Sequence, residues 1–480
     1  MNRGSARGAI LLLLVLAGAV RLMDLGGPSL WLDEAHSLYI ATQSWGEMLD
    51  YIRTYELHPP LHYALLFLWV RLVPFQEFWL RLPHALSGVV AVMGLAWVGR
   101  RLGGARTGWI CGYLAATSQF VILFDSECRM YGPAFCATVA FWVCLLRLYD
   151  SPGKGRSALL VLSAWACAYL EYRLALILVT SSLVFLFASA GAVRRRLFLG
   201  LSVGALGCLP VVPLLRHQAS AAGGGTSMKA FLPPMSLELL SSQIPALAGG
   251  WFLEGSTAVL AAVSVAFLGL ILSLVPALGK NRLLVLGAAT FLGSWAALVA
   301  YSCWITPAYS LHSSVVLSYP FLLGCGLALG RLPRPAALVL CGFWGVFNLY
   351  TLVRFHRDPA WGKQNWKQLL GELQPYWRPD DTVVVVPGFE QFSLLFYWRP
   401  EDFLALEARD FLDEEVKRKL RLRKRIWWFF VNDQIVDRPQ RWRHWLNSGF
   451  KIEFAGQAVN GPFHEITGNG IDVYLVTPTP

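Results

Sequence analysis

Eleven runs of mostly apolar residues occupy the first three-quarters of this 480-residue chain. A helix needs roughly 20 such residues to cross the hydrocarbon core of a bilayer. Hydrophobic residues make up 55% of the chain and charged residues 15%, whereas a soluble domain carries roughly 25% charge. These features exclude an ordinary soluble enzyme, a disordered chain and a disulfide-rich secreted scaffold, and they predict a polytopic α-helical membrane protein. The predicted spans are 8–25, 81–99, 105–124, 132–149, 157–171, 174–191, 197–215, 256–277, 282–303, 313–330 and 335–353.

The positions of Lys and Arg predict the orientation of these spans, because cytoplasmic loops are enriched in both residues. A further apolar segment, 59–74, decides the alternation: if it does not cross, the basic clusters all fall on one side. We therefore predict eleven spans, a cytoplasmic N-terminus, and a helix over 59–74 at the outer interface. The alternative for the first run is a signal peptide cleaved near Ala17-Gly18-Ala19. The outer side then receives 26–80, 125–131, 172–173, 216–255, 304–312 and the C-terminal tail.

Charge divides the chain near residue 353. Residues 1–353 hold 36 charged residues and 354–480 hold 35, so only the tail has the charge density of a soluble domain. Of the net charge of +11, +10 belongs to the first part, which indicates basic cytoplasmic loops rather than nucleic-acid binding. We predict a transmembrane catalytic domain over 1–353 and a small extracytoplasmic α/β domain over 354–480. The elements predicted in the tail are a helix over 366–377 and strands over 381–388, 425–431 and 471–476.

The first outer loop, 26–80, begins with two adjacent carboxylates, Asp33 and Glu34, just beyond the first span. A carboxylate at this position can act as a general base or bind a divalent cation. The alternative is that both acids only stabilise the N-terminus of the next helix.

The same loop continues to His58 and His62, on either side of paired prolines. If a helix starts at Pro59 or Pro60, the two histidines share one face, and this spacing permits metal binding. The alternative is that they are polar groups at the interface.

The second outer loop alternates Glu127, Arg129 and Tyr131, which an extended backbone would aim to one side. Arginine suits bidentate binding of phosphate, but Arg129 could instead pair internally with Asp125 or Glu127. Arg81, at the start of the second span, and Arg173, at the end of a hairpin, are further candidates. No motif in the tail carries chemistry.

Four motifs in this order resemble the GT-C glycosyltransferases, and most closely the group of protein O-mannosyltransferases and lipid A aminoarabinose transferases. They cover roughly residues 25–150. The motifs are Leu30-Trp31-Leu32-Asp33-Glu34, His58-Pro59-Pro60-Leu61-His62-Tyr63, Phe78-Trp79-Leu80-Arg81-Leu82-Pro83 and Glu127-Cys128-Arg129-Met130-Tyr131.

The resemblance implies transfer of a sugar from a polyprenyl-phosphate donor to an acceptor on the outer side of the membrane, with inversion. It implies Asp33 as the catalytic acid residue, with Glu34 beside it. The second outer loop, with Glu127, Arg129 and Tyr131, would help to form the donor and acceptor site. The implied partners are the polyprenyl-phosphate sugar, a lipid, glycan or protein acceptor, and membrane lipids.

One region departs from the family pattern. Many relatives carry an Arg-Tyr pair before a late span, and this chain has no Arg there. Tyr309 and His312 are the candidates for contact with the donor phosphate in that region. The alternative is that the phosphate binds Arg129, Arg173, Arg216 or Lys229. The long loop over 217–255 is a candidate lid, with a passive linker as the alternative.

A transporter or flippase of lipid-linked precursors is the competing class. Acids that gather on one face, with few charges inside the spans, favour surface chemistry over transport. The resemblance favours a bacterial inner or plasma membrane. The sequence decides neither the sugar and the acceptor nor the use of a divalent cation.

Overall fold

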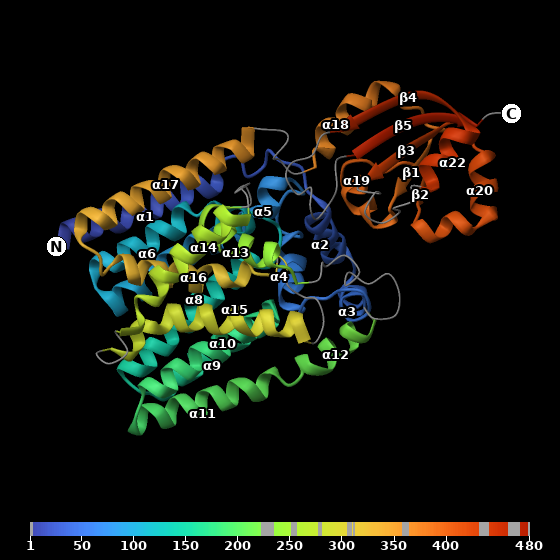
Figure 1. Cartoon of the computed structure of the whole chain (residues 1–480). Helices are drawn as coiled ribbons and strands as arrows, with labels where there is room; N and C mark the ends of the chain where they lie inside the picture. Colours follow the sequence, from blue (N-terminus) through green and yellow to red (C-terminus); the bar gives the residue numbers. More distant parts are fainter. Residues whose placement is uncertain are drawn as a thin grey trace. The chain divides into compact units, whose positions relative to one another are not determined.

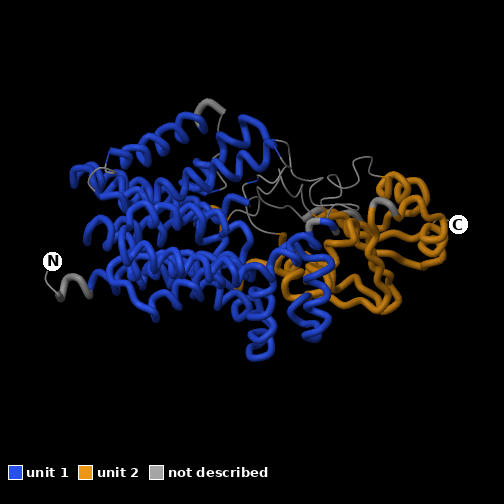
Figure 2. The backbone as a smooth tube through the Cα atoms, turned by 90° about the horizontal axis from the view of Figure 1, so that it is seen from below, with its two compact units in different colours: residues 1–25, 40–352 blue, residues 26–39, 353–480 orange. Residues whose placement is uncertain are grey.

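The computed structural model describes residues 3–221, 235–250, 257–276, 281–304, 310, 313–357, 364–431, 441–458 and 471–478. The backbone separates into two compact units (Figure 2). Unit 1 comprises Met1–Leu25 and Ile40–Leu352, and unit 2 comprises Gly26–Tyr39 and Val353–Pro480. The segment that carries Asp33 and Glu34 therefore belongs to the same unit as the C-terminal tail. The predicted division into domains 1–353 and 354–480 stays a prediction.

Unit 1 is built from α-helices (Figure 1), and each of the eleven predicted spans coincides with a helix or a bent pair of helices. Four described helices are long and apolar enough to cross a membrane, or six if each bent pair is one span. The number eleven therefore stays a prediction. The helices that lie wholly or mostly in unit 1 are α1 (Arg3–Leu22), α3 (Trp45–Thr54), α4 (Leu61–Trp69), α5 (Glu77–Gly103), α6 (Ala105–Thr117), α7 (Gln119–Asp125), α8 (Tyr131–Asp150), α9 (Lys154–Leu170), α10 (Leu174–Ala188), α11 (Gly191–Cys208), α12 (Val211–Ala221), α13 (Leu237–Gly249), α14 (Thr257–Leu272), α15 (Leu286–Trp304), α16 (Ser318–Leu329) and α17 (Arg334–Arg357).

Helix α4 occupies the segment 59–74 that decides the topology. Its nine residues rise about 14 Å, which is less than half the thickness of the hydrocarbon core. This length agrees with the prediction that the segment does not cross.

Glycine allows helices of unit 1 to approach closely. A Cβ atom added to Gly287 of α15 would lie 2.5 Å from the backbone nitrogen of Gly324 in α16. Small residues at such crossings bring backbones into van der Waals contact in membrane proteins. Between α5 and α6, Gly104 has a φ of +89°, a conformation that only glycine adopts without strain.

The span over 105–124 is broken, because α6 and α7 are bent by 62°. A break leaves backbone groups without helical partners, and other side chains satisfy them here. The guanidinium of Arg21 donates hydrogen bonds to the carbonyls of Ala115 and Ala116 at 3.2 and 3.3 Å. Across the break, the side-chain oxygen of Asn348 accepts from the Gln119 N–H at 2.9 Å.

Unit 2 contains a five-stranded mixed sheet in the order β2-β1-β3-β5-β4. Strand β1 pairs in parallel with β2 and β3, whereas β5 pairs antiparallel with β3 and β4. The strands are β1 (Thr382–Val386), β2 (Asp402–Ala405), β3 (Ile426–Val431), β4 (Phe450–Ala458) and β5 (Ile471–Pro478).

Helices cover both faces of this sheet (Figure 1). Alternate residues of β1 and β3 point to opposite sides. Val383 and Phe429 lie in the cluster with α18 (Trp366–Leu373) and α19 (Gln391–Tyr397), whereas Val384 and Trp428 lie with α20 (Glu414–Arg421) and α22 (Arg441–Gly449). The predicted small α/β fold of the tail is thereby confirmed. Strands β2 and β4 were not predicted.

Candidate active site

The adjacent carboxylates Asp33 and Glu34 lie in the first turn of α2 (Leu32–Thr42). The helix N-terminus favours negative charge, as the helix-stabilising alternative requires. The Glu34 side chain is nevertheless fully buried, whereas Asp33 is half-buried. A carboxylate that only stabilises a helix end needs no burial, so the position of Glu34 is not explained by that role alone.

The second outer loop is a tight turn and not an extended segment. Residues 126–130 form bends and turns, and the Arg129 N–H donates to the Glu127 carbonyl at 2.7 Å. Tyr131 is already the first residue of α8. The predicted extended alternation of these side chains was therefore wrong. Glu127 and Arg129 are both buried, with 3% and 4% of their surface exposed.

An ion pair between a half-buried arginine and a buried carboxylate lies in the turn between α9 and α10. Arg173 donates from Nε and Nη2 to the two carboxylate oxygens of Glu171, each at 2.9 Å. Burial alone would raise the pKa of Glu171, but the charge and hydrogen bonds of Arg173, with His58 nearby, lower it to about 2. Tyr131 also forms a hydrogen bond with Arg173. Three of the predicted residues, His58, Tyr131 and Arg173, are thus brought together.

The two histidines of the first outer loop do not share a helix face. Helix α4 starts at Leu61, so His58 precedes it and only His62 lies on it. His58 Nδ1 lies 2.7 Å from Glu56 Oε1. The predicted shared face was wrong because Pro60 forms the N-cap of the helix and does not lie within it.

His62 faces a second histidine, His84 of α5, with 5.4 Å between the ring centroids. Both side chains are buried. Burial, followed by the positive charges of His84 and Arg129, lowers the pKa of His62 well below its usual range. His62 is therefore neutral near pH 7. The effect of Arg129 on this pKa shows that its guanidinium group lies close to the histidine pair.

Gln218 of α12 connects three parts of this cluster, and the sequence did not indicate it. Its side-chain oxygen accepts from the Tyr172 hydroxyl at 2.9 Å. Its amide donates to the carbonyls of Ile52 and His58 at 2.9 and 3.3 Å. Because Gln218 is almost fully buried, these contacts fix His58 relative to the α9–α10 turn.

Of the remaining predicted residues, one lies on α5 and two lie outside the described residues. Arg81 is buried in α5 and donates to the Leu25 carbonyl at 3.0 Å. Tyr309 and His312 lie outside the described residues, as do 222–234 and 251–255 of the proposed lid. Asp125, one of the proposed internal partners of Arg129, instead binds Arg21 of α1.

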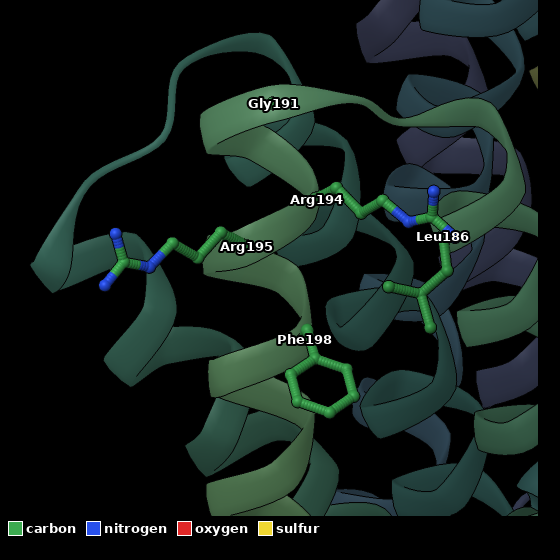
Figure 3. A pocket seen from close by; sticks show the side chains of 5 residues that line it. All are labelled: Leu186, Gly191, Arg194, Arg195 and Phe198. Carbon is green, nitrogen blue, oxygen red and sulfur yellow. The ribbon is translucent and has the colours of Figure 1, made fainter.

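Among the described residues, no group of three His, Cys, Asp or Glu side chains is placed to hold a metal ion. A cavity of about 510 Å³ opens at the turn between α10 and α11 (Figure 3), where the Arg194 side chain extends toward Leu186 and that of Arg195 extends away. The fifteen residues of α10 rise about 22 Å between this turn and Arg173. The cavity is therefore not part of the cluster around Glu171.

Comparison with known proteins adds to this geometry. Residues 57–217 match the dolichyl-phosphate-mannose-protein mannosyltransferase family. The crystal structure of ArnT from Cupriavidus metallidurans bound to undecaprenyl phosphate is similar with a TM-score of 0.60 and 13% identity, and the match covers 97% of this chain and 98% of that chain. The chain has the fold of this ArnT structure. No curated protein sequence matches it significantly.

Two further structures share this fold. ArnT from the same organism in the apo state gives a TM-score of 0.60 at 13% identity, with 98% of each chain covered. The apo oligosaccharyltransferase from Archaeoglobus fulgidus gives 0.53 at 12% identity, covering 90% of this chain and 70% of that chain. The predicted GT-C resemblance and fold class are therefore confirmed. His58, Arg81, Glu127, Arg129, Tyr131 and Arg173 all lie within the family match, whereas Asp33 and Glu34 precede it.

Proposed function

We propose that this protein transfers a sugar from a polyprenyl-phosphate donor to a lipid, glycan or protein acceptor at the outer face of a bacterial plasma membrane. The observation that carries the proposal is the match, over almost the whole length of both chains, to an ArnT structure that holds undecaprenyl phosphate. An apolar helical bundle suits such a substrate, because the lipid tail remains in the bilayer while the phosphate reaches the interface.

We propose Asp33 as the general base. An acceptor hydroxyl is a weak nucleophile near neutral pH, and a carboxylate within hydrogen-bond reach can remove its proton during attack on the anomeric carbon. A single displacement of this kind inverts the anomeric centre. Glu34, buried in the same helical turn, is the second catalytic candidate.

The cluster in unit 1 would bind and stabilise the leaving phosphate. Arg129 and Arg173 bring guanidinium groups to neighbouring turns, and His58 and Tyr131 add polar contacts. Positive groups held in a water-excluded site stabilise developing negative charge more strongly than they would in water. The pairing of Arg173 with Glu171 fixes the orientation of its guanidinium group. A divalent cation could supplement these groups.

The basic loops support the orientation that this function needs. The N-terminal end of α11 carries Arg194 and Arg195, and the turn at the opposite end of α10 carries the Glu171–Arg173 pair. With the basic end in the cytoplasm, the acid-rich end faces outward. A glycosyltransferase with this orientation would act on donors already presented at the outer surface.

The test compares cell-envelope lipids and outer-surface glycans by mass spectrometry in cells with and without the protein. The purified full-length protein in vesicles is then offered undecaprenyl-phosphate mannose and undecaprenyl-phosphate aminoarabinose, with a membrane-lipid extract as acceptor. We expect Asp33→Asn to lower transfer by roughly 10²–10⁴-fold, the usual contribution of a general base. The exposed carboxylate in the same loop, Asp50→Asn, is the matched control.

Wild-type transfer by Asp33→Asn would remove the role assigned to Asp33. Movement of the donor across the bilayer without sugar transfer would favour the transporter class instead.

A further inference from the structure

The segment that carries the proposed general base is held by the C-terminal part of the chain. Gly26–Tyr39 clusters with Val353–Pro480, and not with the helices of unit 1 that precede and follow it (Figure 2). We propose that unit 2 positions Asp33 for catalysis, and that Tyr397 is the principal positioning residue. This inference rests on the function proposed above and gives the C-terminal domain a role in it.

Tyr397 binds the backbone just before the catalytic helix. Its hydroxyl oxygen accepts a hydrogen bond from the Leu30 N–H at 2.7 Å. Leu30 is fully buried and lies two residues before the start of α2, where the backbone has no helical partner. A buried N–H without an acceptor is costly, so this bond fixes the path by which the chain reaches Asp33.

A second set of hydrogen bonds anchors the segment one residue earlier. The Ser29 hydroxyl accepts from the Lys367 N–H at 3.0 Å and donates to the Asn365 side-chain oxygen at 3.4 Å. Asn365 is the N-cap of α18. Ser29 thus satisfies an amide in the first turn of α18, where helices lack internal acceptors.

Aromatic contacts hold the first two turns of α2. The Phe392 ring centroid lies 4.8 Å from those of both His36 and Tyr39. His36 and Tyr39 are three residues apart and share one helix face, and His36 itself follows Asp33 by three residues. The contact with Phe392 therefore restrains the rotation of α2 about its axis, which determines the direction of Asp33.

The two side chains that make these contacts lie on one helix that is packed against the sheet. Phe392 and Tyr397 both lie on α19, and the intervening Leu394 is fully buried in the core against the sheet. This arrangement predicts an effect on turnover rather than on donor affinity, because a displacement of about 1 Å in a catalytic group can cost 10²-fold in rate.

The experiment uses the full-length protein in vesicles, with undecaprenyl-phosphate mannose or undecaprenyl-phosphate aminoarabinose as the probe donor. Tyr397→Phe removes the hydroxyl and keeps the ring. We expect kcat to fall about 10-fold with KM for the donor within about 2-fold, well inside the range that misplacement can produce. Hydrogen exchange in the peptide 26–39 should accelerate at least about 5-fold, because the Leu30 amide loses its acceptor. Tyr376→Phe, at an exposed tyrosine of the same unit, is the control and should change neither value.

Phe392→Leu is a second variant, which removes the two ring contacts and keeps an apolar side chain. It should lower kcat in the same direction, whether or not Tyr397→Phe folds fully. Unchanged kcat in Tyr397→Phe, with or without faster exchange, would overturn the positioning role. A loss of thermal stability with no change in exchange over 26–39 would also overturn it. Full activity of Asp33→Asn would instead contradict the proposed function, so the two failures are distinguishable.

Discussion

Arg21 and Asp125 form an ion pair that is sealed from solvent, with 2.9 Å between Nε and Oδ2 and both side chains 0% exposed. The pair joins α1 to the end of α7, and Asp125 directly precedes the turn that contains Glu127 and Arg129. Its role is therefore both to hold the broken helix together and to fix the start of that turn.

Removal of one partner leaves an uncompensated buried charge. We expect Arg21→Met or Asp125→Asn to destabilise the protein by about 3–5 kcal/mol, measured as thermal unfolding in detergent. The double variant Arg21→Met/Asp125→Leu should be milder than Arg21→Met alone, since no charge is stranded. The exposed pair Arg101–Asp150 is the control, and Arg101→Met should cost at most about 1 kcal/mol. A double variant no more stable than Arg21→Met would show that the pair contributes more than mutual neutralisation.

The close approach of α15 and α16 predicts a sharp contrast between two glycines. Gly287→Ala places a Cβ atom against backbone and should destabilise by about 1–3 kcal/mol, as overpacking does. The Cβ atom of Gly342→Ala in α17 meets no atom within 4 Å. This variant should be neutral or stabilise the protein by about 0.5–1 kcal/mol, because alanine lowers the backbone entropy of the unfolded chain. Thermal unfolding of both variants in the same detergent measures the difference. Equal effects would contradict the packing described for α15.

The lowered pKa of Glu171 predicts that the protein loses stability at acidic pH. Its pKa is lowered to about 2, so its ionised form stabilises the fold fully above the unfolded value near 4.5. This contribution is lost as the pH falls from about 4.5 toward 2. The difference in unfolding free energy between wild type and Glu171→Gln should therefore shrink by about 3 kcal/mol between pH 6 and pH 2, since one pKa unit is roughly 1.4 kcal/mol. A constant difference across this range would disprove the assignment.

The lowered pKa of His62 predicts that stability depends on pH in a second, higher pH range. Its pKa is lowered by burial and by the positive charges of its neighbours, so the unfolded chain takes up a proton near pH 6.5 before the folded protein does. Stability should therefore decrease as the pH falls from 7.5 to 5. His62→Asn should reduce this slope, measured by denaturant or thermal unfolding, and the exposed His444→Asn serves as the control. If the dependence of stability on pH is unchanged in His62→Asn, a group other than His62 takes up the proton on unfolding.

Regular patterns in the sequence predicted the regular parts of the fold. Apolar runs located the helices of unit 1. The mostly apolar segments 382–386 and 426–431 located strands β1 and β3, which are buried on both faces. Strand β2 was missed because it is a four-residue edge strand of intermediate burial, which carries no strong pattern. Strand β4 was missed because an irregular register between Ile452 and Phe454 interrupts its alternation.

The candidate site was only partly predictable, because its geometry depends on contacts between distant residues. The motifs identified Asp33, His58, Arg129 and Tyr131 one at a time. Local patterns could not show that Arg21, 104 positions away, would bind Asp125, or that Arg129 would lie close enough to His62 to lower its pKa. The conformation of the turn 126–130 could not be predicted from the sequence either, because short polar segments are compatible with several backbone conformations.

The hydrogen bond between Leu30 and Tyr397 has a consequence for biosynthesis. The two residues are separated by 367 positions. At roughly 5–20 residues per second, the ribosome needs about 20–70 s after making Leu30 before Tyr397 exists. The segment 26–39 therefore emerges from the ribosome and passes to the membrane long before Tyr397 is translated. A nascent or prematurely terminated chain that contains every helix of unit 1 would still lack this contact, so the segment 26–39 can reach its final arrangement only after the C-terminal part has been synthesised.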